Sequence, residues 1–196
     1  MTSADAATVA ERKHRLRQEM RARRMAMPAA AHAAASRAAA WAALSGLPWR
    51  DRPEVALFWP LADEIDTLPL LHALHWLGAR PLLPRMQGRG RPLTFHAWKP
   101  DAPLVQGPFR VLEPTPDLAA VLPRIVLAPL LAFDRAGRRL GYGAAFYDMT
   151  FAALAAAAPL RVGYCFACQE VAAVPADASD VALELVVTET GCHVIT

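Results

Sequence analysis

The chain has 196 residues, of which 55% are hydrophobic and 20% charged, and its formal net charge is +3 at pH 7. This length suits one domain with a sizeable core, and this composition excludes an intrinsically disordered chain. Three cysteines, an odd number, argue against a disulfide framework, and because neither a signal peptide nor a membrane span is recognisable, we expect a cytoplasmic protein.

A basic helix is predicted over residues 8–26. Lys13, Arg17 and Arg21 recur at i, i+4 and i+8, so they share one face of this helix. The positive charge of the chain concentrates here, and the remaining residues are mildly acidic. A solvated helix surface and a face that neutralises an anion are both compatible with this pattern.

Strands and helices alternate in the rest of the chain. Pro28 opens a second, alanine-rich helix, so a helical segment covers about residues 8–46. A helix is expected after Thr67, its N-cap, and another after the glycines near residue 143. Strands are expected at residues 55–59, 81–83, 93–98, 125–128, 160–166, 185–188 and 194–195, with a proline-rich connection at 100–116.

This alternation predicts an α/β fold for residues 1–196, a single domain with an open, mostly parallel sheet and helices on both faces. Ligands of such sheets bind outside the carboxyl ends of the strands. The loop around Glu64 and the glycine-rich stretch both follow strands. We therefore expect them to meet at the same edge of the sheet.

Residues 134–148 have the composition of a phosphate-binding loop. Gly141 and Gly143 let the backbone approach an anion, the following helix offers free N–H groups, and Arg139 adds a forked donor. Asp148, in the first helical turn, is placed to hold a magnesium ion that bridges phosphate oxygens. A plain strand-to-helix turn also carries such a glycine pair, so the motif alone is not specific.

The surrounding residues resemble a family signature. Residues 133–148 read Phe-Asp-Arg-Ala-Gly-Arg-Arg-Leu-Gly-Tyr-Gly-Ala-Ala-Phe-Tyr-Asp. They resemble the signature Phe-Asp-x-x-Gly-x-Arg-Leu-Gly-x-Gly-x-Gly-Tyr-Tyr-Asp of 5-formyltetrahydrofolate cyclo-ligases. Four further blocks occur in the family's order: Lys13-His-Arg-Leu-Arg17, Glu64-Ile-Asp-Thr67, Leu83-Pro-Arg85 and Leu112-Glu-Pro114.

The resemblance implies a reaction and a set of ligands. The reaction is the ATP-dependent cyclisation of 5-formyltetrahydrofolate to 5,10-methenyltetrahydrofolate, with release of ADP and phosphate. ATP would phosphorylate the formyl oxygen, and N10 of the folate would then displace phosphate. The implied fold is Rossmann-like, similar to the sugar-phosphate isomerase and CoA-transferase-like folds. The implied protein is a monomer whose partners are ATP, Mg²⁺ and the folate, with neither nucleic acid nor membrane.

The resemblance also implies residue roles. Lys13 and Arg139 would act in catalysis by stabilising the developing charge. ATP would contact Lys13, Arg17, Arg139, Leu140, Gly141, Tyr142, Gly143, Ala144, Ala145, Phe146 and Tyr147. The folate would contact Glu64, Tyr142, Phe146 and Trp59, although core packing is an equally good interpretation for this tryptophan. Asp148 and Asp180 would hold the magnesium ion.

Three positions depart from the family pattern. Ala145 replaces the third glycine of the signature, Phe146 its first tyrosine, and Ser179 a histidine near the C-terminus. We expect Ala145 to be helical, because Ala144 and Ala145 lead into an alanine-rich run. With a positive φ instead, alanine would be strained there and glycine would be the better residue. These departures keep open a second function, a nucleotide or folate binder with weakened turnover.

Two other patterns suggest sites but favour structural roles. Cys165 and Cys168 form a Cys-x-x-Cys at the end of a strand, where packing is favoured over a metal or redox site. His72 and His75 are expected to lie on a helix without a third ligand. Nucleic-acid binding by the basic helix is the remaining rival, although no aromatic residues interleave its charges.

Overall fold

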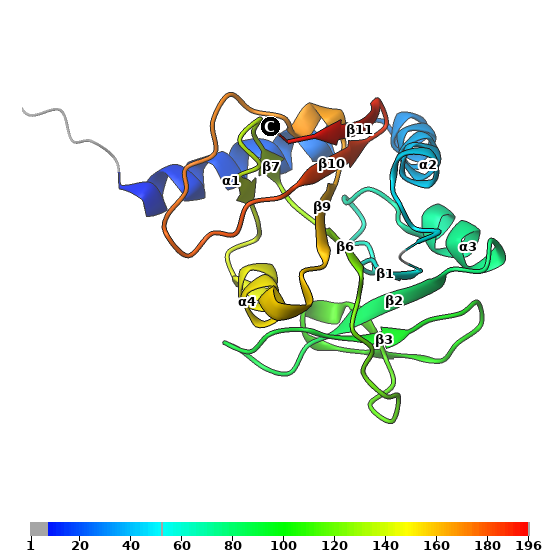
Figure 1. Ribbon diagram of the computed structural model, residues 1–196. Helices are drawn as coiled ribbons and strands as arrows, with labels where there is room; N and C mark the ends of the chain where they lie inside the picture. Colours follow the sequence, from blue (N-terminus) through cyan, green and yellow to red (C-terminus); the bar gives the residue numbers. More distant parts are fainter. Residues whose placement is uncertain (1–7, 52, 196) are drawn as a thin grey trace, which may run out of the picture.

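A seven-stranded sheet forms the centre of the computed structural model, which describes residues 8–51 and 53–195 (Figure 1). In spatial order the strands are β11 (Gly191–Val194), β10 (Leu185–Thr188), β9 (Leu160–Tyr164), β6 (Ile125–Ala128), β1 (Glu54–Ala56), β2 (Arg80–Arg85) and β3 (Thr94–Ala97). The five inner strands are parallel, and β11 and β3 pair antiparallel at the two edges. The predicted mostly parallel sheet is confirmed.

The strand order places a crevice at the centre of the sheet. From β1 the chain first builds outward through β2 and β3, and then returns to the other side of β1 with β6, β9 and β10. The loops after β1 and β6 therefore leave the sheet in opposite directions. Ligands of open α/β sheets bind at such a reversal of strand order.

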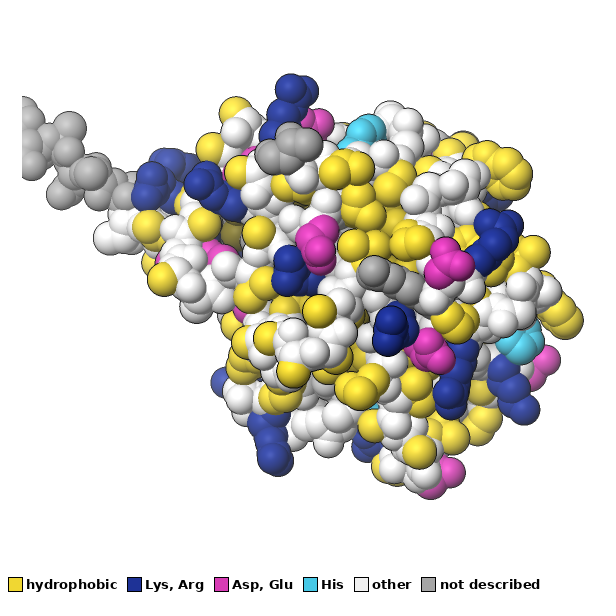
Figure 2. Space-filling view, viewed as in Figure 1, with side chains coloured by type: hydrophobic (Ala, Val, Ile, Leu, Met, Phe, Trp, Pro, Cys, Tyr) yellow, Lys and Arg dark blue, Asp and Glu magenta, His cyan; other side chains and the backbone are white. Residues whose placement is uncertain are grey.

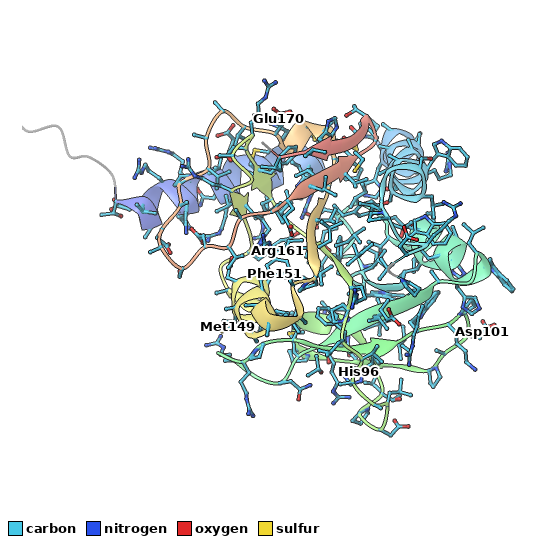
Figure 3. All side chains as sticks on the ribbon, in the orientation of Figure 1. His96, Asp101, Met149, Phe151, Arg161 and Glu170 are labelled. Atoms are coloured by element: carbon cyan, nitrogen blue, oxygen red, sulfur yellow. The ribbon has the colours of Figure 1, made fainter. Side chains whose placement is uncertain are left out.

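The described residues form four α-helices: α1 (Val9–Met25), α2 (Ala29–Gly46), α3 (Leu68–Trp76) and α4 (Phe146–Ala153). Side chains alternate along the strands, so Val55 and Leu57 pack with α2 and α3 while Ala56 faces the other side. There Phe151 of α4 packs against Ala56 and Val126, and Figure 3 shows it pointing from α4 toward the sheet. The predicted helices on both faces are confirmed.

Local signals explain where the helices begin. Thr8 and Glu11 form a capping box at the start of α1, because each side chain bonds the other residue's backbone N–H. At α3 the expected N-cap Thr67 makes no capping bond, since its hydroxyl donates to the Phe58 carbonyl 2.7 Å away. The Asp66 carboxylate instead accepts from the Leu68 N–H at 2.9 Å.

Some expected boundaries are wrong. Residues 100–116 are not a plain connection, because β4 (Leu104–Gln106) and β5 (Leu112–Pro114) pair there as an antiparallel hairpin. A second small hairpin, β7 (Ala132–Phe133) with β8 (Arg139–Leu140), lies ahead of the glycines. Both are too short for a clear alternating pattern. Within the described residues, no helix is both long and apolar enough to cross a membrane.

Candidate active site

A cavity of about 400 Å³ lies at the carboxyl ends of β1, β2 and β6. Phe58 and Trp59 line it just after β1, Pro84 and Met86 at the end of β2, and Pro129 just after β6. The stretch from Gly141 to Asp148 supplies another wall. The expectation that the Glu64 loop and the glycine-rich stretch open onto one edge of the sheet is confirmed.

A buried carboxylate and a phenol form one part of the cavity wall. The Glu64 carboxylate accepts a hydrogen bond from the Leu61 N–H at 2.8 Å and a short one from the Tyr142 hydroxyl. Burial raises the pKa of Glu64, and these hydrogen bonds together with the charge of Arg24 oppose that rise. Burial and the nearby Glu64 charge also raise the pKa of Tyr142, so its hydroxyl stays a donor.

Aromatic side chains stand beside this carboxylate. Trp59 is half-buried and Phe58 buried, and both line the cavity with Phe146. The ring of Phe109, on the turn between β4 and β5, meets Phe146 edge to face at 6.4 Å. The cavity therefore combines flat apolar surfaces with a deeply placed acceptor, a combination that suits a planar heterocycle with N–H donors.

The glycine-rich stretch turns into α4 beside a cation from α1. Gly143 has φ +100°, and Arg17 donates from Nε to the Gly141 carbonyl at 2.9 Å. The Arg17 guanidinium would lie 3.5 Å from a Cβ built on Gly143, so Arg17 sits beside this glycine. Helix α1 thus brings a positive charge to the amino end of α4, where free backbone N–H groups also favour an anion.

Ala145 does not have the expected helical conformation. It is the residue before α4 and has φ 54° and ψ 17°, in the left-handed region. The chain reverses between β8 and α4 within a few residues, and this turn places positive φ at both Gly143 and Ala145. An alanine pays a steric cost for this conformation that glycine does not.

Arg139 and Asp148 form a partly buried ion pair in the cavity wall. Arg139 Nη2 lies 2.7 Å from Asp148 Oδ1, and the guanidinium sits 5.4 Å from the Phe151 ring centroid. Asp148 Oδ1 also accepts from the Val181 N–H at 3.1 Å. Arg139 Nε is buried and has no hydrogen-bond partner among the described residues, which leaves one donor of this forked group unused.

Lys13 and Asp180 bind one another rather than lining the cavity. Lys13 Nζ is 2.7 Å from Asp180 Oδ2 and 2.8 Å from Asp177 Oδ2. The bond from Lys13 holds the pKa of Asp177 well below its usual range. The exposed start of α1, where Lys and Arg side chains gather in Figure 2, is therefore tied to the loop before β10.

The residues present fit a magnesium ion at Asp148. Mg²⁺ is usually bound by one or two carboxylates while phosphate oxygens and waters complete its shell. Asp148 Oδ2 has no hydrogen bond to any described residue, whereas Oδ1 is engaged. Asp180 lies next to Val181, which touches Asp148, but its Oδ2 is held by Lys13. The described residues contain no group of three or more potential metal ligands.

Some cavity residues were not expected, and some expected residues lie elsewhere. Glu113 is buried in the wall, accepts from the Met86 N–H at 3.2 Å and has its pKa raised by burial. Its family-like Leu-Glu-Pro block was the signal that pointed to it, and Arg21 belonged to the predicted basic helix face, whereas no sequence signal pointed to Phe109. Leu140 is absent from the cavity wall because its side chain packs in the core with Met20.

The remaining candidates lie outside the cavity wall: the cysteines in or beside the core, and the histidines on α3, where His72 is exposed. Cys165, directly after β9, is buried in a core cluster with Val186 of β10, and burial raises the pKa of its thiol. Cys168 packs against the main core cluster without a disulfide. The rings of His72 and Trp98 meet edge to face at 5.2 Å, while His75 meets Trp76 in the same way.

Comparisons with known proteins point to one family. The model of the 5-formyltetrahydrofolate cyclo-ligase family matches residues 9–189. The 5-formyltetrahydrofolate cyclo-ligase of Escherichia coli K12 is 36% identical over 140 residues, covering 68% of this chain and 76% of that protein. That of Haemophilus influenzae is 30% identical over 178 residues, 88% of this chain and 95% of its own. The solved 5,10-methenyltetrahydrofolate synthetase of Aquifex aeolicus matches with TM-score 0.80 and 25% identity, covering 93% and 92% of the two chains.

Proposed function

The chain belongs to the 5-formyltetrahydrofolate cyclo-ligase family, and we propose that it cyclises 5-formyltetrahydrofolate to 5,10-methenyltetrahydrofolate at the expense of ATP. Beyond membership of the family, one feature of this structure supports the proposed reaction. A single cavity joins a buried acceptor, Glu64, to the glycine-rich turn with Arg139 and Asp148. A folate and a polyphosphate can therefore meet in one enclosure.

The folate's pterin ring would bind at Glu64. A reduced pterin carries several N–H donors on one edge, and a carboxylate accepts such donors in pairs. Glu64 is fixed by Leu61 and Tyr142, so its orientation needs no adjustment on binding. Trp59 and Phe146 would cover the faces of the ring, since both line the same cavity.

The ATP phosphates would bind at the turn into α4. Backbone groups from Gly141 to Tyr147, the amino end of α4, Arg17 and Arg139 would compensate their charge. Lys13 would have to exchange Asp177 and Asp180 for a phosphate to take part. Asp148, with Asp180 as a supporting carboxylate, would hold the magnesium ion, whose charge neutralises phosphate oxygens when it is bound.

The chemistry needs no nucleophile from the protein. The formyl oxygen attacks the terminal phosphorus of ATP and ADP leaves; N10 of the folate then adds to the activated carbon, and the oxygen departs with phosphate. The chain's own contribution is to align the two ligands and to stabilise the charge that develops on the transferred group. Arg139, which lines the cavity, would supply positive charge for that purpose.

A direct assay tests the proposal. The protein is incubated with ATP, Mg²⁺ and 5-formyltetrahydrofolate while the near-ultraviolet absorbance of the methenyl product is followed, with ADP measured in parallel. We expect one ADP per methenyl group formed and no product without ATP. Product formation that does not require ATP, or ADP formation without product, would contradict this function.

The strained Ala145 favours one second candidate, a folate and nucleotide binder with little turnover. Calorimetry separates the two, because the weakened relative would bind both ligands yet form no methenyl product. For the working protein we further propose a cytoplasmic monomer that acts only on small molecules. Sedimentation at micromolar concentration, with and without the ligands, tests the monomer.

A further inference from the structure

Arg24, near the end of α1, is a buried charge outside the cavity wall. Only 2% of its side chain is exposed, and arginine is almost never buried to this extent unless it is paired. Its partner is Asp63, whose Oδ2 accepts from both Nε, at 3.1 Å, and Nη2 of Arg24. Asp63 is 32% exposed and precedes Glu64 in the chain, so the pair ties α1 to the Glu64 loop.

The same guanidinium also contacts the glycine-rich stretch. Its central carbon lies 5.6 Å from the Tyr142 ring centroid, and that tyrosine donates its hydroxyl to Glu64. A ring face attracts a cation, and the attraction grows when the pair is desolvated. Arg24 therefore contacts Asp63, the residue before Glu64 in the chain, and Tyr142, which donates a hydrogen bond to the Glu64 carboxylate.

Stability alone is a weak reason for this arrangement. A buried ion pair commonly contributes no more than well-packed apolar residues would, because both charges lose their hydration. What an apolar side chain at this position would not supply is a positive charge close to the carboxylate of the cavity. The positive charge of Arg24 and its contacts with Asp63 and Tyr142 all affect the carboxylate of Glu64.

We propose that Arg24 is a positioning residue for the folate: by anchoring Asp63 and lying over Tyr142, it keeps the Glu64 carboxylate aimed into the cavity. The inference rests on the proposed function, in which Glu64 accepts the pterin's hydrogen bonds. Arg24 itself contacts neither substrate. Its effect is expected on folate binding and not on ATP binding.

The charges around Glu64 influence its pKa, so the role of Arg24 can be tested by measuring kcat/KM for the folate as a function of pH. Polar and charged groups face it from several elements: Arg24 and, over the Tyr142 ring, Arg21 from α1, His32 from α2 through the Glu64 carbonyl, Asp63 from its own loop, and Tyr142 and Tyr147 from the glycine-rich stretch and α4. Arg24 lowers the pKa of Glu64 and Asp63 raises it. Removing one or the other charge should therefore shift the pKa of Glu64 in opposite directions.

The first test compares neighbouring arginines. Arg24→Met removes the buried charge, Arg24→Lys keeps a charge without the fork, and Arg23→Met is the matched control, because Arg23 pairs on the surface with Glu19. In Arg24→Met we expect the KM for 5-formyltetrahydrofolate to rise about tenfold while the KM for ATP stays unchanged. Arg24→Lys should fall between wild type and Arg24→Met, and Arg23→Met should match wild type. An unchanged folate KM, or equal rises for both substrates, overturns the inference.

The second test uses opposite signs. In kcat/KM for the folate, the acid limb should move to higher pH in Arg24→Met and to lower pH in Asp63→Asn, whose amide oxygen still accepts from Arg24. If Arg24 had a purely structural role, the acid limbs of the two variants would move in the same direction or stay in place. That result refutes the inference. If wild type shows no turnover, the proposed function fails separately; folate affinity by calorimetry then decides, and an affinity that is absent, or unaltered in Arg24→Met, overturns the inference.

Discussion

The two ends of α1 treat charge differently. Near its end, Arg24 is buried and fixed between Asp63 and Tyr142, and these contacts also fix Glu64. Near its start, Lys13 is held by Asp177 and Asp180, of which the first is half-exposed on the surface. The Arg24 side chain is 2% exposed, whereas that of Lys13 is 12% exposed and that of its partner Asp177 49%, so the Lys13 pair is more open to water and exchanges its partner more easily. The fixed end suits a rigid heterocycle, and the exchangeable end suits a phosphate chain that arrives with its own cation.

The largest effect is expected from a change outside α1, at Asp148 in the first turn of α4. Asp148→Asn should lower kcat about a hundredfold, because the amide loses the charge that pairs with Arg139 and that we propose binds magnesium. Folate affinity, measured by calorimetry, should stay near the wild-type value. A normal kcat throughout a magnesium titration would show that Asp148 only anchors Arg139.

Glu64→Gln tests the fixed end. We expect the folate KM to rise about thirtyfold, since one charged acceptor of pterin donors is lost. The same change should stabilise the protein at neutral pH, because burial raises the pKa of Glu64 above its ordinary 4.5. An acid with a raised folded-state pKa costs stability as the pH rises from its ordinary value through the raised one.

Thermal unfolding across pH checks this sign. The melting temperature of Glu64→Gln should exceed that of wild type near pH 7, and the difference should vanish as the pH falls below about 4.5. A constant difference at every pH would mean that Glu64 is not titrating in this range, and that its carboxylate is less costly to bury than its surroundings suggest.

Lys13→Ala tests the exchangeable end. The KM for ATP should rise about fivefold as one phosphate-binding cation is lost, while the thermal midpoint barely moves. Asp177→Asn offers the complementary change, because it weakens the hold on Lys13 and should lower the KM for ATP. If neither variant changes ATP kinetics, Lys13 serves only to tie α1 to the loop before β10.

Ala145→Gly should give the smallest effect. Glycine relieves the left-handed alanine and should stabilise the fold by about 1 kcal/mol, which raises the melting temperature by about 2–4 °C in a chain of this size. ATP binding should tighten slightly, because the turn no longer resists its conformation. Ala144→Gly is the matched control: Ala144 is not among the residues with positive φ, so glycine there should not stabilise. Equal melting temperatures for both variants would contradict the strain.

The sequence predicted those features that depend on local or periodic signals. The helix over residues 8–26 matches α1 within a residue at each end, because its cap and charge pattern are local. The parallel sheet followed from the alternation of apolar strands with amphipathic helices. Trp59, Glu64 and the stretch after Arg139 could be placed at one edge because loops that follow parallel strands share that edge.

Tertiary structure decided what depends on distant partners. The left-handed angle of Ala145 comes from the turn between β8 and α4, not from the helix propensity of alanine. The hairpins β4–β5 and β7–β8 depend on pairing between strands of two or three residues, which are too short to show an alternating hydrophobic pattern in the sequence. Lys13 and Arg24 are both basic residues of one helix, yet Lys13 pairs with Asp177 and Asp180 in the loop before β10, whereas Arg24 is buried against Asp63 and the Tyr142 ring. Sequence fixes which charges a helix carries, and only packing decides which of them lose water and therefore act strongly on their neighbours.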